Sequence, residues 1–121
     1  ATWNGFRNPE QLSLPHLVAI AREIGGDRHR FRFIQLPYNL AMLEAMRQTT
    51  YEGKNVLEQS VDLGVTAVAS ASLLQSRLSR NLPEPLHRLI RGVESDAQRA
   101  IQFTRSAPGI AVALVGMSNP A

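Results

Sequence analysis

Three short apolar segments with strand character each follow a helix-like segment, and this alternation constrains the fold more than any other feature. The strand-like segments are 31–36, 65–70 and 110–115. Strands that alternate with helices are joined by right-handed crossovers, so they form a parallel sheet with helices packed on it. Residues 65–70 are apolar on both alternating faces, which is typical of a parallel strand covered on both sides. The sequence therefore predicts an α/β fold.

The helices that precede these strands have recognisable ends. Ser13 is suited to cap the first helix, and Ser95 with Gln98 forms a capping box at the start of the last. Ile24 and Val61 fall on the apolar faces of the first two helices, so both are expected in the core. Helices are expected at 14–24, 54–63 and 96–105, with shorter ones at 40–46 and 85–91 and a polar loop at 47–53. Long connections follow the strands, and α/β proteins build ligand sites from such loops.

Composition excludes several functional classes. The chain has no cysteine, which rules out disulfides and thiolate metal sites. It has neither the run of about 18 apolar residues that a membrane helix needs nor a signal-peptide pattern, so we expect a cytoplasmic protein without a membrane partner. The net charge of +3 comes from scattered arginines. Only 28–32 is densely basic, and nucleic-acid binding through it is the least favoured alternative.

Few residues have the pattern of a catalytic or metal site. His16, His29 and His87 are not at ligand spacing, and we interpret each as a surface residue. No nucleophile elbow and no glycine-rich phosphate loop occurs. Tyr38 follows a strand end, and packing of its ring against a neighbour is favoured over a functional role. Gln35 ends an apolar strand, where its amide could hold a planar ligand amide or bind neighbouring backbone, and the spacing leaves both open.

Three stretches resemble the C-terminal half of the aldo-keto reductases, in the bacterial branch of predicted oxidoreductases. Residues 33–39 resemble the sixth strand of the family's (β/α)₈ barrel, 63–73 the seventh, and 97–120 the seventh helix and eighth strand. Residues 2–6 would end the fifth. The resemblance implies a single domain over 1–121 that covers roughly strands five to eight.

The implied architecture is a partial TIM barrel, a half-barrel of about four parallel strands with outer helices. A complete barrel takes ~250 residues, about twice the length of this chain. The sequence also begins within a strand-like segment and stops at the turn that would open a further helix. We therefore expect a fragment of a larger protein.

Members of this family reduce carbonyl compounds by hydride transfer from a nicotinamide cofactor, and the resemblance implies NADP here. Gln35 would hydrogen-bond the nicotinamide carboxamide, and Asn4 matches the asparagine at the end of strand five. The other matching cofactor-binding positions are Ser70, Leu73, Gln75, Gly116, Met117 and Ser118. At Ser70 the family often has a tyrosine that stacks on the nicotinamide ring, and a serine cannot do so.

The resemblance implies no catalytic residue in this chain, because the family's catalytic side chains come from the first four strands. We expect a fragment of an NADP-dependent carbonyl reductase that is inactive alone. The alternative is a non-catalytic half-barrel that serves in binding or assembly. Phe31, Phe33 and Val68 would lie on a sheet face that the other strands normally cover. We therefore expect a homo-oligomer, a domain-swapped one included, association with the missing half-barrel, or collapse into a flatter α/β sandwich.

Overall fold

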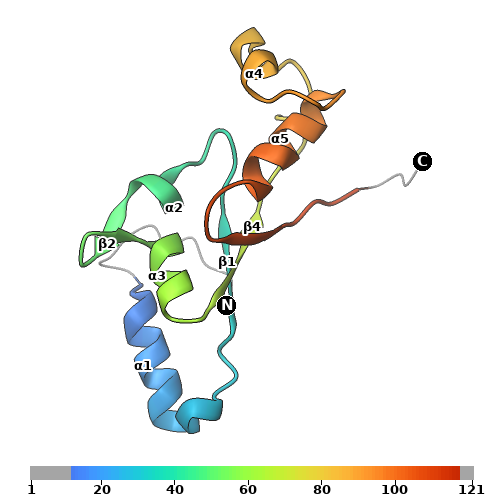
Figure 1. Cartoon of the computed structure of the whole chain (residues 1–121). Coiled ribbons are helices and arrows are strands. Elements are labelled where there is room, and N and C mark those ends of the chain that lie inside the picture. Colours follow the sequence, from blue (N-terminus) through green and yellow to red (C-terminus); the bar gives the residue numbers. More distant parts are fainter. Residues whose placement is uncertain (1–11, 118–121) are drawn as a thin grey trace.

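The computed structural model describes residues 12–117 (Figure 1). In this part of the chain, a parallel sheet of three strands has the order β1, β4, β5. The strands are β1 (Phe33–Pro37), β4 (Thr66–Ser70) and β5 (Ile110–Ala113). The helices are α1 (Leu14–Gly25), the short 3₁₀ helix η2 (Gly26–Arg28), α2 (Glu44–Arg47), α3 (Val56–Asp62), α4 (Glu84–Leu89) and α5 (Asp96–Arg105). The predicted α/β class and parallel pairing are confirmed.

Capping side chains fix where the helices begin. Ser13 caps α1, and Ser95 with Gln98 forms the expected capping box at α5. The helix predicted from residue 54 begins instead at Val56, because the Asn55 side chain accepts hydrogen bonds from two first-turn amides, each 3.0 Å long. A side-chain oxygen that binds these otherwise unpaired amides sets the first helical residue.

The prediction of a polar loop at 47–53 is wrong. This stretch contains β2 (Thr49–Tyr51), which pairs antiparallel with β3 (Lys54–Asn55). In the turn between them, Glu52 and Gly53 have φ angles of 47° and 74°. Two consecutive residues with positive φ make the tight turn that joins hairpin strands.

One face of the sheet forms the core together with the helices. β1 and β4 are paired in register from Phe33 opposite Thr66 to Pro37 opposite Ser70, so alternate side chains point the same way. The inward residues are at most 1% exposed: Ile34, Leu36, Ala67 and Ala69. Side chains packed with them include Leu14 and Val18 of α1, Val56 and Leu57 of α3, and Phe103 of α5.

Two apolar helix residues expected in the core are exposed instead. Ile24, in the last turn of α1, is 84% exposed, and Val61 of α3 is 65% exposed. Helical spacing places a residue on the apolar face, but burial also requires a neighbouring element opposite that turn.

The opposite face of the sheet is partly exposed to solvent. On it, Phe33 is 60% exposed and Val112 is 47% exposed, while Val68 is half-buried. Leu114, directly after β5, is 42% exposed. Of the three residues predicted for an uncovered face, Phe33 is exposed and Val68 is partly so, whereas Phe31 packs against the core.

The described sheet contains three of the about four strands that were expected. Residues 2–6, predicted to end a further strand, lie outside the described residues. Among residues 12–117, no helix combines the length and the apolar character that a membrane crossing requires.

Candidate ligand-binding site

The loop after β4 has an unusual backbone conformation at the carboxyl end of the sheet. Ala71 has a φ of 57°, and the consecutive residues Leu74, Gln75 and Ser76 have φ angles of 46°, 52° and 67°. Non-glycine residues rarely adopt this left-handed conformation, and such residues gather at ligand sites. The loop is therefore a candidate for a functional segment.

Asn39 holds this loop in place, a role that the sequence did not reveal. Asn39 is fully buried just after β1. Its Nδ2 donates to the carbonyl oxygen of Ala71 at 2.8 Å, and its Oδ1 accepts from the backbone N–H of Ala41 at 2.9 Å. A residue at the end of β1 thereby fixes the loop that follows β4. Asparagine in a turn after a strand was the available signal.

A cavity of about 380 Å³ lies between this loop and the ends of the strands. Five of the predicted cofactor-binding residues line it: Gln35, Ser70, Leu73, Gln75 and Gly116. They come from the ends of three parallel strands and the loops that follow, which is where α/β proteins bind ligands. The structure thus brings together residues that lie up to 81 positions apart in the sequence, from Gln35 to Gly116.

Ser72, which was not predicted, also lines the cavity and has an unpaired hydroxyl. Ser72 is 1% exposed, and its Oγ makes no hydrogen bond to any described residue. A buried polar group is almost always paired, so an unpaired one in a cavity wall indicates a place for a ligand atom or water.

Gln35 is half-buried in the cavity wall, and its amide makes no hydrogen bond within the described residues. No backbone group within residues 12–117 therefore satisfies this amide. Its carboxamide can both donate and accept toward the cavity.

Of the predicted cofactor-binding residues that the structure describes, Met117 does not line this cavity. It is 76% exposed. Asn4 and Ser118 lie outside the described residues, so their predicted roles remain predictions.

The chemistry available in the cavity is neutral. None of the described side chains that line it is charged. Its polar groups are the amides of Gln35 and Gln75, serine hydroxyls, and backbone N–H groups of the loop. Such a set can orient a ligand through hydrogen bonds, but it has no group suited to general acid–base catalysis at neutral pH.

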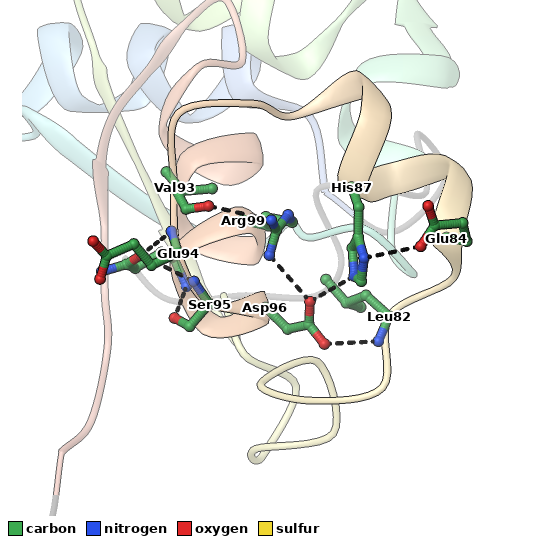
Figure 2. A network of polar contacts seen from close by, with 9 residues as sticks. Leu82, Glu84, His87, Val93, Glu94, Ser95, Asp96 and Arg99 are labelled. Carbon is green, nitrogen blue, oxygen red and sulfur yellow. Dashed lines mark hydrogen bonds and ion pairs between the residues drawn. The ribbon is translucent and has the colours of Figure 1, made fainter.

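A separate polar cluster ties α4 to the start of α5 (Figure 2). The Asp96 carboxylate accepts from the backbone N–H of Leu82 at 3.0 Å and lies 2.8 Å from Nε2 of His87 and 3.4 Å from Nη1 of Arg99. On its other side, Nδ1 of His87 lies 3.3 Å from Glu84. The Leu82 hydrogen bond, followed by that of His87, holds the pKa of Asp96 below its ordinary value. The cluster lies at the end of the long connection between β4 and α5, which begins with the cavity-lining loop.

The histidines differ in how well they match the prediction of surface positions. His16 is exposed, as predicted. His29 is buried at 9% exposure, so the prediction is wrong for this residue, and its Nδ1 makes no hydrogen bond to a described residue. His87 is part of the Asp96 cluster. Within residues 12–117, no group of histidine and carboxylate side chains could hold a metal ion.

Tyr38 has the packing role that the sequence favoured. Its ring stacks on Phe103 with centroids 5.8 Å apart and an interplanar angle of 10°. Tyr38 is 2% exposed. Burial raises the pKa of its hydroxyl, and the nearby Arg47 guanidinium opposes this effect in part.

Comparison of the chain with protein-family models, curated proteins and solved structures finds no match.

Proposed function

We propose that the cavity at the strand ends binds the nicotinamide and pyrophosphate portions of NADP. In this proposal the chain is the C-terminal half-barrel of an oxidoreductase of the aldo-keto reductase type that reduces carbonyl compounds. The observation that carries the proposal is that five of the residues implied by the resemblance, contributed by three strand ends, line one cavity.

The cavity walls fit the polar groups of such a cofactor. The Gln35 carboxamide makes no hydrogen bond to residues 12–117 and can pair with the carboxamide of nicotinamide. Ser72 has a buried unpaired hydroxyl, and the backbone N–H groups of Gln75 and Ser76 make no hydrogen bond within the described residues. Successive free N–H groups in a turn form a concave site for phosphate oxygens. At position 70 a serine stands where the family often has a tyrosine, so this residue cannot stack on the nicotinamide ring.

The chain's own residues would bind and orient in this reaction rather than transfer protons. When bound, the cofactor supplies the hydride that reduces the carbonyl carbon. No described side chain that lines the cavity is titratable near neutral pH, so we assign protonation of the carbonyl oxygen to another part of the parent enzyme. The isolated chain is expected to bind NADPH weakly and to reduce no carbonyl compound.

NADPH fluorescence titration of the full chain tests this proposal. Gln35→Ala and Ser72→Ala are expected to weaken binding about five- to tenfold, because each loses one hydrogen bond in a desolvated site. Gln48→Ala is the matched control, since Gln48 is exposed and lies outside the cavity. Absence of saturable binding, or equal binding by the wild type and Gln35→Ala, would refute the proposal.

A second candidate is a non-catalytic module that serves in assembly. The exposed apolar face with Phe33 and Val112 favours it, because apolar surface of this kind is often an interaction site. A second copy of the chain or the missing half-barrel would cover this face. Association measured by light scattering, together with no NADPH binding, would favour this candidate over the reductase fragment.

A further inference from the structure

A second concave site lies on the helix-covered side of the sheet, away from the cavity at the strand ends. Its volume is about 450 Å³. Tyr38 and Phe103 contribute aromatic rings to the lining, and Leu89, Ile90 and Arg91 line it from the end of α4. The two cavities share no lining residue, so this site can have a ligand of its own.

The lining offers a preorganised apolar surface. The rings of Tyr38 and Phe103 are stacked, which fixes the orientation of both. Met46 adds a thioether, and its sulfur accepts a hydrogen bond from the Tyr38 hydroxyl at 3.6 Å. Leu89 is 78% exposed at the edge of this surface. A ligand that covered Leu89 would gain apolar burial that the chain itself does not provide.

The charge of the lining is positive. Arg91 is its one charged residue among the described part of the chain. Nε of Arg91 donates to the carbonyl oxygen of Arg88 at 2.8 Å, which orients the guanidinium, and Arg91 makes no ion pair with a described residue. Arg47 lies near enough to Tyr38 to affect the pKa of the tyrosine. A guanidinium without an acidic partner is suited to two-point binding of a carboxylate.

We propose that this cavity binds a small apolar monocarboxylic acid. The carboxylate pairs with Arg91, and the apolar body lies against Phe103 and Leu89. The volume favours a small molecule over a polypeptide, because it is near the lower end of the ~300–1,000 Å³ that small-ligand pockets occupy. The positive charge excludes amines, and the apolar lining disfavours polar polyanions such as nucleotides. The site does not depend on the proposed reductase function.

A fluorine NMR titration of the full chain with para-trifluoromethylphenylacetate tests the proposal. Saturable binding is expected, with Arg91→Gln weakening it about tenfold through loss of the charge-assisted pair. Leu89→Asn is expected to weaken it about three- to tenfold. Arg88→Gln is the matched control, because Arg88 lies three residues before Arg91, has a side chain that is 76% exposed, and does not line the cavity.

Two further measurements make the assignment specific. The neutral amide of the same probe should bind about tenfold more weakly than the acid, and octanoate should displace the acid. Phe33→Ser should leave binding unchanged, since Phe33 is on the opposite face of the sheet. The proposal is overturned by absence of saturable binding, by equal binding of acid and amide, by an Arg91→Gln affinity equal to wild type, or by loss of binding in Phe33→Ser.

Discussion

Replacing Asn39 with alanine is expected to lower the free energy of unfolding by about 2 kcal/mol. The side chain is fully buried and makes two hydrogen bonds, to the carbonyl of Ala71 and from the N–H of Ala41. Each such bond contributes about 0.5–1.5 kcal/mol net, and their sum gives the estimate. For a chain of this size, a loss of about 2 kcal/mol lowers Tm by roughly 8 °C.

Thermal and urea unfolding followed by circular dichroism measure this effect, and the exposed Gln48→Ala should change stability by less than about 0.5 kcal/mol. Asn39→Asp retains the acceptor for Ala41 but places a carboxylate oxygen against the Ala71 carbonyl, so it is expected to be at least as destabilising as Asn39→Ala. Both Asn39 variants should also weaken NADPH binding. An Asn39→Ala protein as stable as Gln48→Ala would refute the view that this amide fixes the loop after β4.

Three other perturbations follow from the structure. In urea unfolding, Gly109→Ala should lower the free energy of unfolding by at least about 2 kcal/mol and Gly53→Ala by about 1 kcal/mol. Both glycines have positive φ, but only at Gly109 would the new Cβ lie 3.1 Å from a backbone oxygen of α3. Equal effects would contradict this. The lowered pKa of Asp96 means that its contribution to stability is present above the unfolded value of about 3.8 and is lost as the pH falls through the lower folded value. The difference in unfolding free energy between wild type and Asp96→Asn should therefore be constant near neutral pH and shrink in acid. If that difference were unchanged at pH ~2, the ionised Asp96 carboxylate would not be what stabilises the fold. Phe33→Ser should reduce self-association in light scattering while leaving Tm nearly unchanged; a wild-type chain that is already monomeric at high concentration would remove this expectation.

The sequence predicted the elements whose signals are local. The capping box at Ser95 located α5, and the apolar run at 65–70 located β4, each to within a residue or so. The alternation of elements was sufficient to predict parallel pairing, because a crossover helix leaves few other ways to connect neighbouring strands. The grouping of Gln35, Ser70 and Gly116 in one cavity follows from the same topology.

The features that the sequence did not reveal depend on contacts between distant residues. The sequence predicted that Asn55 lies within the helix, whereas in the structure its side chain caps the helix by accepting hydrogen bonds from first-turn amides. The burial of Ser72 and of His29 depends on which loops cover them. Ile24 has the spacing of a core residue but is 84% exposed. Periodicity identifies a face, whereas burial is a property of the assembled fold.

The left-handed run at Leu74, Gln75 and Ser76 has a consequence for ligand affinity. Glycine would adopt these angles without steric cost, whereas each side chain here costs roughly 1–2 kcal/mol. Without a ligand, these three residues have access to fewer backbone conformations than three glycines would have. The entropy of ordering this turn is thus lost when the chain folds, so a ligand of the proposed site would not have to order it on binding.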